Sequence, residues 1–443
     1  MSKQLDRNPI FSKALDLMEN GKPFVFITGR AGTGKSTLLR TFREESSLVF
    51  PVLAPTGVAA LNVGGETIHR FFRFAPGMSM KDAKRRGFSR REDPLLNKID
   101  GFIIDEISMV RADLLDCMDV FLQAALGTPA PFGGKRIIAI GDLAQLPPVL
   151  TRHEQEAFLK AYETPYFFSA RGTQTLLATS QVDFIELETV YRQTDPEFIR
   201  LLNSIRDQRP EKEDLQAINA RFGKVHAKQD HDIILTTTND QADRINQEHL
   251  SAINKPAFTY NAIMDGDFQV KDAPTDEALV LKQGARVMCI ANDIGGSYVN
   301  GSLGTIKDLD ELTVTVELDN ETTVTLGTHA WTLFQSKYDE DTHTLVQEKL
   351  GSFAQIPLRL AWAVTIHKSQ GKTFDKLIID LERGAFAHGQ IYVALSRCRS
   401  LEGITLTKPI QSHHIHADHS VGEFLTCLRE QRPFLLKGQT SLI

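Results

Sequence analysis

Features typical of membrane, secreted and disulfide-bonded proteins are missing from this sequence of 443 residues. It contains no run of about 18 uninterrupted apolar residues, so we expect no membrane span. Its first residues lack the apolar core of a secretory signal. Only four cysteines occur, and no two of them form a C-x-x-C pair. We therefore expect reduced thiols and a cytoplasmic, intracellular protein.

The sequence also lacks a positive net charge, because 50 Lys and Arg stand against 56 Asp and Glu. This does not exclude a nucleic-acid partner, since the local field governs binding. Residues 81–91 carry six basic side chains against one acid: Lys81, Lys84, Arg85, Arg86, Arg90 and Arg91 against Asp82. With Phe74 and Phe88 nearby, this stretch suits single-stranded nucleic acid, whose phosphates meet charges and whose bases stack on rings. A solvated face is the alternative interpretation.

A glycine-rich loop follows the apolar run Phe24–Ile27 and matches the pattern G-x-x-x-x-G-K-[ST]. Such a loop turns its N–H groups toward phosphate oxygens, with a helix N-terminus behind it. Lys35 would reach the β- and γ-phosphates, and the Ser36 hydroxyl would ligate Mg²⁺. The residues expected to hold the nucleotide are Gly29, Ala31, Gly32, Thr33, Gly34, Lys35, Ser36 and Thr37. A strand pattern before the loop and a helix pattern after it predict a nucleoside triphosphate site.

Two later strand patterns end in polar residues that suit triphosphate hydrolysis. Asp105 and Glu106 follow the run at 102–104, and Gln145 follows the run at 136–140. In P-loop enzymes an Asp at a strand end holds Mg²⁺, and a neighbouring residue can orient the attacking water. We expect Gln145 to sense the γ-phosphate.

The order of strand and helix patterns predicts several domains. A first α/β domain ends near residue 180, and the alternation restarts at 183–187 to form a second parallel sheet. Short strands separated by turn residues interrupt this second domain and indicate a small β-barrel. The expected domains are 1–180 with a small wedge insert at about 72–97, 181–255 together with 356–412, the barrel at 256–355, and a tail at 413–443. The tail is rich in histidine, but with no cysteine nearby we do not predict a metal site there.

Further polar segments add to this picture. Arg192 and Arg397 each lie in an apolar, helix-like frame, and an arginine that reaches a γ-phosphate stabilises the transition state. Supplied from a second domain, the two arginines would close that domain on the nucleotide. The alternative for each is a surface ion pair.

Thr56 could cap a helix or contact a nucleic-acid phosphate.

Eight segments occur in an order that resembles one protein family: GRAGTGKS, APTGVAAL, GGETIHRFF, DEIS, GDLAQLPPV, VYRQ, AVTIHKSQGKTFD and YVALSRCRS. The order resembles the superfamily 1 DNA helicases, B subclass, and most closely the Pif-type (petite integration frequency) group, related to Dda and RecD. The resemblance runs from about residue 8 to about residue 410.

The resemblance implies an α/β protein with two RecA-like P-loop motor domains, an SH3-like insert in the second and a wedge insert in the first. It implies a monomer that hydrolyses ATP with Mg²⁺ at the interface of these domains. Such an enzyme moves 5′ to 3′ on single-stranded DNA, acts at single-strand/duplex junctions, and unwinds duplexes and G-quadruplexes. No membrane partner is implied.

The family's functional residues map onto matching positions of this sequence. The implied catalytic residues are Lys35, Asp105, Glu106, Gln145, Arg192 and Arg397, with Ser36 and Asp105 as metal ligands. Gln370 and Gly371 would couple the nucleotide to the DNA strand. The implied DNA contacts are Pro55, Thr56, Gly57, Thr67, His69, Asn239, Thr365, His367 and Lys368.

One position departs from the family pattern, in which a glutamine near the first helix reads adenine. The aligned position holds Ser12, and the nearest glutamine, Gln4, lies 25 residues before Gly29. We therefore expect partial use of dATP and GTP. Two other functions stay open at this point, a nucleotide-gated DNA binder without processive motion and an RNA translocase.

Overall fold

The computed structural model describes residues 8–436 except 76, 92, 151, 225–231, 271–272, 294, 340–343, 383, 385–386, 417 and 435. Gln4 lies outside the described residues. The chain divides into two compact units. The first comprises Met1–Tyr191, Phe334–Glu348 and Asp418–Ile443, and the second comprises Arg192–Leu333 and Lys349–Ala417. Among the described residues, no helix is both long and apolar enough to cross a membrane.

A six-stranded parallel sheet forms the centre of the first unit, in the order β3-β2-β4-β5-β1-β6. Its strands are β1 (Phe24–Gly29), β2 (Val52–Ala54), β3 (Glu66–Thr67), β4 (Gly101–Ile104), β5 (Arg136–Ile140) and β6 (Val182–Leu187). Because all strands run the same way, their carboxyl ends share one edge, where α/β proteins bind ligands. The helices of this unit are α1 (Pro9–Asn20), α2 (Lys35–Glu45), α3 (Gly57–Val63), α4 (Ile68–Phe71), α5 (Met80–Ser89), α6 (Pro94–Lys98), α7 (Ala112–Leu126), α8 (Arg152–Ala161), α9 (Arg171–Ala178) and α14 (His419–Arg429).

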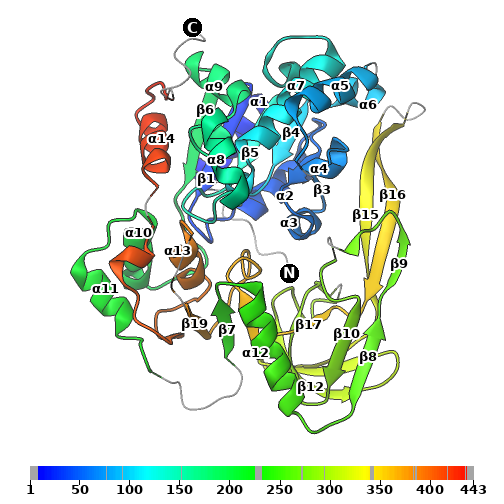
Figure 1. Ribbon diagram of the computed structural model, residues 1–443, viewed down its shortest axis with the longest axis vertical. Coiled ribbons are helices and arrows are strands. Elements are labelled where there is room, and N and C mark those ends of the chain that lie inside the picture. The colour runs from blue at the N-terminus through cyan, green and yellow to red at the C-terminus, as the bar shows by residue number, and fades with distance from the viewer. Residues whose placement is uncertain are drawn as a thin grey trace. The chain divides into compact units, whose positions relative to one another are not determined.

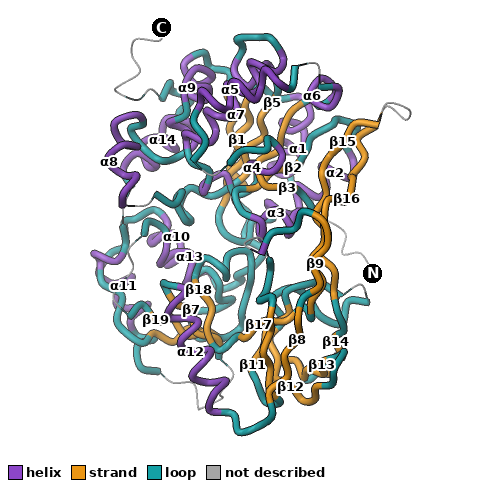
Figure 2. The backbone as a smooth tube through the Cα atoms, turned by 45° about the vertical axis from the view of Figure 1, so that its right-hand side comes forward, coloured by secondary structure: helices purple, strands orange, loops and turns teal. Residues whose placement is uncertain are grey.

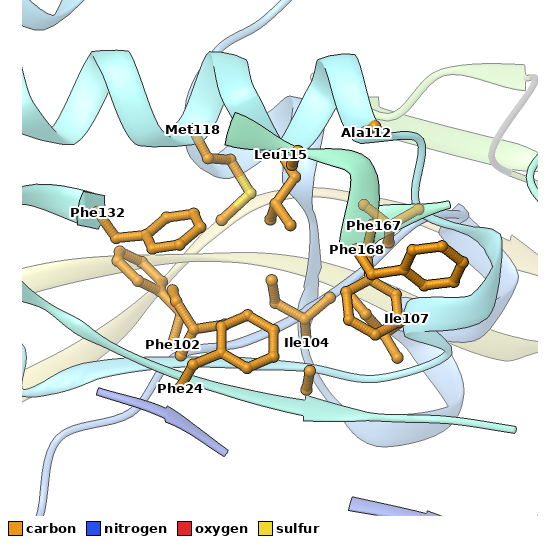
Figure 3. Close-up of a cluster of buried hydrophobic side chains, with 14 of the residues drawn as sticks. Phe24, Phe102, Ile104, Ile107, Ala112, Leu115, Met118, Phe132, Phe167 and Phe168 are labelled. Carbon is orange, nitrogen blue, oxygen red and sulfur yellow. The ribbon is translucent and has the colours of Figure 1, made fainter. Parts of the chain in front are cut away.

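Both faces of this sheet are covered by helices, as the unbroken apolar run of β1 requires. Phe24 and Phe26 belong to a core that includes side chains of α7, α9 and α14. Val25 and Ile27 belong to the core on the opposite face, with α1 and α2. Figure 3 shows part of the first core, where aromatic rings pack around Leu115 of α7.

Strand β6 belongs to the first sheet, so the prediction that the second domain starts at residue 181 is wrong. β6 pairs with β1 along its whole length, from Phe24 opposite Val182 to Gly29 opposite Leu187. The apolar pattern of β6 indicates a strand but does not tell which sheet it joins, because parallel pairing is a long-range contact. The boundary between the units falls after Tyr191.

Helix α14 also belongs to the first unit, so the separate tail predicted at 413–443 is wrong for this helix. The ring of Phe424 lies 4.4 Å from that of Phe168 and 6.0 Å from that of Phe26, between centroids. Arg429 forms an ion pair with Glu186 of β6 at 2.9 Å. The apolar face of α14 is therefore buried in the same core as β1 (Figure 3 shows Phe168).

The wedge stretch at about 72–97 contains the helices α5 and α6. Helix α5 packs along α7 (Figure 1), and Gly87 permits the close approach because a Cβ there would lie 2.3 Å from the Phe121 carbonyl oxygen. Phe74 is buried in the core, so the interpretation of this ring as a base-stacking residue is wrong. Phe88 is exposed.

A four-stranded parallel sheet in the order β18-β7-β19-β20 organises the second unit. Its strands are β7 (Ile233–Thr236), β18 (Ala363–Thr365), β19 (Leu377–Asp380) and β20 (Ile404–Leu406). Its helices are α10 (Pro196–Arg206), α11 (Lys212–Asn219), α12 (Asn239–Ala252) and α13 (Gln390–Leu395). The predicted second parallel sheet is present, without the strand at 183–187.

An all-β region interrupts this unit, and Figure 2 shows its strands β11, β12 and β13 side by side. The stretch Phe334–Glu348, within β15 and β16, belongs to the first unit. Its strands are β8 (Ala257–Asn261), β9 (Ile263–Gly266), β10 (Ala278–Lys282), β11 (Arg286–Cys289), β12 (Leu303–Leu309), β13 (Val314–Leu318), β14 (Thr323–Leu326), β15 (His329–Asp339), β16 (Thr344–Gln355) and β17 (Leu358–Leu360). Five of them form an antiparallel sheet in the order β14-β13-β12-β11-β17. Because β17 pairs with β11, the region extends beyond the predicted end at residue 355. We call it the β insert.

Candidate nucleotide and nucleic-acid site

The glycine-rich loop joins β1 to α2, as the sequence predicts. Gly32 and Gly34 have φ angles of 82° and 87°, in the left-handed region that glycine adopts without steric cost. A Cβ on Gly29 would lie 2.6 Å from Thr33 Oγ1, so a side chain there would collide with the loop. No side chain caps the N-terminus of α2. Its first N–H groups are therefore oriented to bind an anion.

Lys35 holds the loop in its present conformation. Its ammonium donates hydrogen bonds to the carbonyl oxygens of Gly29 at 2.6 Å and Arg30 at 3.0 Å. Both acceptors are neutral, so a triphosphate would offer stronger, charge-assisted bonds to the same ammonium. Ser36 follows Lys35 as the second residue of α2 and is exposed.

The predicted acids follow β4, in the middle of the sheet. Burial raises the pKa of Asp105, while the backbone N–H of Glu106 and the charge of Lys35 oppose this shift. The charge of Lys35 acts on this carboxylate, and a cation held by Asp105 could bridge it to a phosphate. Glu106 has φ 52° and ψ 44°, a left-handed conformation that costs energy in any residue but glycine. Strain of this kind clusters at functional sites.

Gln145 is buried just beyond the end of β5. Its backbone N–H donates to the Asp142 carbonyl at 2.9 Å, and its side-chain amide donates to Asp142 Oδ2 at 3.3 Å. Asp142 also accepts a hydrogen bond from the N–H of Ala144 at 3.1 Å. One buried carboxylate therefore orients the glutamine next to β1 and β4.

The predicted DNA contacts of the first unit gather at the ends of β2 and β3. These strands are neighbours, with Ala54 opposite Thr67. Thr56 caps α3 by accepting from the N–H of Ala59 at 3.2 Å, and Thr67 caps α4 in the same way. The capping interpretation of Thr56 is therefore confirmed. Pro55, Gly57 and His69 stand next to these caps in the chain.

The predicted DNA contacts Thr365 and Asn239 of the second unit lie at the carboxyl edge of its sheet. Thr365 ends β18, which pairs with β7, and Asn239 begins α12 just after β7. The Thr365 hydroxyl is buried and accepts from the Lys368 N–H at 3.2 Å. Burial lowers the pKa of both His367 and Lys368.

The two predicted arginines meet within the second unit. Arg397 is only 1% exposed, and its guanidinium donates to Val393 O at 3.0 Å and Ser396 Oγ at 2.8 Å. Arg192 donates to the Ser396 carbonyl at 3.3 Å. Gln193 reinforces this junction by donating to the carbonyls of Ser396 and Cys398, at 3.1 and 3.0 Å.

Arg397 also contacts the segment that contains Gln370 and Gly371. Its Nη1 atom lies 3.5 Å from the Ser369 carbonyl oxygen and 3.4 Å from that of Lys372. The structure therefore brings three predicted motifs together: those of Arg192, of Arg397, and of the segment that contains Gln370 and Gly371.

Known proteins are similar to this chain in sequence and in fold. The family described as PIF1-like helicase matches residues 4–216. The ATP-dependent DNA helicase Pif1 of Bdellovibrio bacteriovorus is 33% identical over 412 residues, which cover 91% of this chain and 88% of that protein. This chain belongs to the PIF1-like helicase family.

Solved structures of the family agree with the observed fold. A Bacteroides sp. Pif1 in complex with ADP-AlF4 is 34% identical and superposes with a TM-score of 0.86, covering 98% of this chain and 100% of that chain. A Bacteroides Pif1 bound to single-stranded DNA is also 34% identical and has a TM-score of 0.68, covering 98% of this chain and 100% of that chain. The expected α/β fold with RecA-like parallel sheets is confirmed for this PIF1-like helicase.

Tyr191, near the glycine-rich loop of the PIF1-like helicase, was not predicted as a site residue. The Tyr191 ring is 49% exposed, and two of its carbons lie 3.9 Å from the Cβ position of Gly34. Its N–H donates to the Gly32 carbonyl at 2.9 Å, and its hydroxyl accepts from the Asn8 amide at 3.3 Å. The exposed ring offers a flat surface beside the loop. Its position just before Arg192 in VYRQ was the available signal.

The basic stretch of this PIF1-like helicase divides into engaged and exposed cations. Arg90 is half-buried, pairs with Asp93 at 2.5 Å and lies 5.7 Å from the centroid of the Phe121 ring. It therefore supports the fold of the wedge stretch. The exposed cations of the stretch are Lys81, Lys84, Arg85 and Arg91. The guanidinium of Arg91 lies 5.6 Å from the centroid of the exposed Phe88 ring.

Proposed function

We propose that this chain is an ATP-dependent DNA helicase that moves 5′ to 3′ on single-stranded DNA and unwinds duplexes. One observation carries the proposal. The phosphate-binding loop follows β1, the acids follow β4, and the DNA-contact candidates follow β2 and β3, all at the carboxyl edge of one sheet. A DNA strand and a triphosphate that bind along the same edge of this sheet can influence each other through the rigid sheet. The direction of travel comes from the family resemblance.

Each residue around the triphosphate has a proposed role. Lys35 would leave the loop carbonyls for the β- and γ-phosphates, and the α2 N-terminus would bind phosphate oxygens. Ser36 and Asp105 would hold Mg²⁺, and the bound ion would neutralise phosphate charge. Glu106 would accept a proton from the attacking water, and Gln145 would position that water.

The second unit would supply the arginines. Arg192 and Arg397 are the residues we propose to stabilise charge on the γ-phosphate in the transition state. Arg397 would have to exchange carbonyl partners for phosphate oxygens, so its release would depend on the nucleotide. Such an exchange suits a mechanism that converts hydrolysis into movement of Gln370 and Gly371.

The nucleic-acid side is proposed from the edges of both sheets. Thr56, Thr67 and Thr365 lie at strand ends where backbone N–H groups and hydroxyls can meet phosphates. We propose that the chain acts as a monomer at single-strand/duplex junctions. The all-β region is proposed to be the SH3-like insert, and α5 and α6 the wedge.

An unwinding assay tests the proposal directly. With ATP and Mg²⁺, the protein should separate a duplex that carries a 5′ single-stranded tail and leave a 3′-tailed duplex intact. Lys35→Ala should abolish both hydrolysis and unwinding. Oligo-dT should stimulate ATPase activity more than oligo-U does. Equal unwinding of both tailed duplexes would contradict the direction, and stimulation by oligo-U alone would indicate an RNA translocase.

A further inference from the structure

Lys372 follows Gly371 directly and connects its segment to the β insert. Its ammonium donates a hydrogen bond to Asn300 Oδ1. Its aliphatic stem packs against Gly301, whose Cβ position lies 3.7 Å from Lys372 Cβ and Cγ. Gly301 has a φ of 101°, which favours glycine at this contact.

The turn that Lys372 contacts is itself fixed to the β insert. The Gly301 N–H donates to the Cys289 carbonyl at 2.9 Å, and the Cys289 N–H donates to the Ser302 carbonyl at 2.8 Å. The Ser302 hydroxyl also accepts from the Val299 N–H at 3.0 Å. We call residues 299–302 the Asn300 turn. A displacement of Asn300 would therefore be transmitted to β11 through short backbone hydrogen bonds.

The other end of Lys372 contacts the arginine cluster. Its carbonyl oxygen lies 3.4 Å from Nη1 of Arg397, and its N–H donates to the Ser369 carbonyl at 3.0 Å. One residue thus joins the proposed γ-phosphate arginine to the β insert, through its carbonyl on one side and its ammonium on the other.

Placing the Lys372 ammonium in this partly buried position costs desolvation free energy. The ammonium is partly buried, and within the described part of the chain no carboxylate pairs with it. Burial, assisted by the charge of Arg359, lowers the pKa of Lys372 to about 8. An apolar side chain of similar length would fill this position without the desolvation penalty. Stability alone therefore does not explain a lysine here.

We propose that Lys372 and Asn300 form a mechanical link that makes the β insert follow the Gln370–Gly371 segment during each ATP cycle. Lys372 acts in this proposal as a positioning residue. The link rests on the proposed helicase function. Without it, ATP would still be hydrolysed, but fewer base pairs would separate for each ATP consumed.

The test measures base pairs unwound per ATP hydrolysed by the full chain. Lys372→Met keeps the aliphatic stem and removes the ammonium. It should lower this ratio by at least about ten-fold, the scale of one lost hydrogen bond to a charged group, while the ATPase KM stays unchanged. Asn300→Ala should do the same, and the double variant should be no worse than either single variant, because both remove one interaction. Asn300→Asp, which keeps an acceptor, should retain the wild-type ratio.

Lys376→Met is the matched control. Lys376 is exposed in the same segment and does not contact Asn300. Lys376→Met removes the same charge as Lys372→Met, so the variant should unwind as many base pairs per ATP as the wild type. In the wild type the ratio should fall between about pH 7 and 9 as the Lys372 ammonium loses its proton. Of the groups around it, burial lowers the pKa of Arg359, and burial raises the pKa of Tyr298 and of Cys289, the latter to about 12. Lys372→Met should lack this fall.

Several outcomes would overturn the link. Lys372→Met with a wild-type ratio would do so, as would additive losses in the double variant. If Lys372→Met fails to fold, Asn300→Ala with a wild-type ratio would have the same meaning. A wild-type protein that hydrolyses no ATP, or unwinds no duplex, would instead contradict the proposed function.

Discussion

Because Glu106 has a left-handed backbone, we expect Glu106→Gly to raise the stability of the protein relative to Glu106→Ala, although it abolishes ATP turnover. Glu106 has φ 52° and ψ 44°, and a non-glycine residue pays roughly 1–2 kcal/mol in this region. Glycine avoids that cost but adds about 0.4–1 kcal/mol of entropy to the unfolded chain. The relief of strain is the larger effect, so Glu106→Gly should stabilise the protein by about 0.5–1 kcal/mol relative to Glu106→Ala.

Alanine is the right reference because it removes the same carboxylate and keeps the strained backbone. For a unit of this size, 1 kcal/mol corresponds to about 2–4 °C in Tm. Thermal unfolding should therefore place Glu106→Gly about 1–4 °C above Glu106→Ala. Both variants should lack ATP turnover, because each lacks the proposed proton acceptor. Glu106→Gln should bind nucleotide, lose turnover and melt close to the wild type.

Two outcomes would refute this reasoning. A Tm of Glu106→Gly at or below that of Glu106→Ala would show that the backbone at this position stores no relievable strain. Turnover by Glu106→Gln at the wild-type rate would show that the carboxylate does not act in hydrolysis.

The remaining predictions concern other parts of the chain. Phe424→Ala should destabilise the first unit by about 3–5 kcal/mol, measured by denaturant unfolding, because it empties a buried aromatic cluster; a loss below about 1 kcal/mol would mean that α14 is a dispensable tail. Burial raises the pKa of Asp116 to about 6, so its contribution to stability is present at low pH and is lost as the pH rises through about 6. Asp116→Asn should remove this dependence, which is worth at most roughly 3 kcal/mol, and an unchanged pH profile of Tm would contradict it. The protein should hydrolyse dATP and, more weakly, GTP, whereas turnover confined to ATP in a triphosphate panel would count against that; Tyr191→Ala should raise the KM for all of them by removing the ring beside the loop. Replacing Lys84 and Arg91 by Gln should weaken DNA binding and make the slope of log K against log salt concentration shallower by up to about 2, one for each charge removed. Unchanged binding at every salt concentration would identify a solvated face.

Residues that act through their local backbone were predictable from the sequence. The glycine-rich loop is one case, because Gly32 and Gly34 supply angles that other residues avoid, and a strand and a helix flank them. Asp105, Glu106 and Gln145 are similar cases, because apolar runs predict the strands that they follow. Thr56 was predicted to cap α3 from its place at a strand-to-helix turn. In each case neighbours in the chain decide the geometry.

Only the tertiary structure decided which sheet each strand joins and which way each long side chain turns. β6 reads as a strand from its residues, yet its pairing with β1 depends on contacts more than 150 residues apart in the chain. The end of the chain was predicted to be a tail, but Phe424 of α14 packs against Phe26 of β1 and against Phe168 near α9. Arg90 and Arg91 are adjacent in a basic stretch, and packing alone makes Arg90 a half-buried support of the fold and leaves Arg91 exposed. Sequence periodicity records how a segment meets its immediate neighbours, whereas sheet order and buried polar contacts depend on chain segments brought together only by folding.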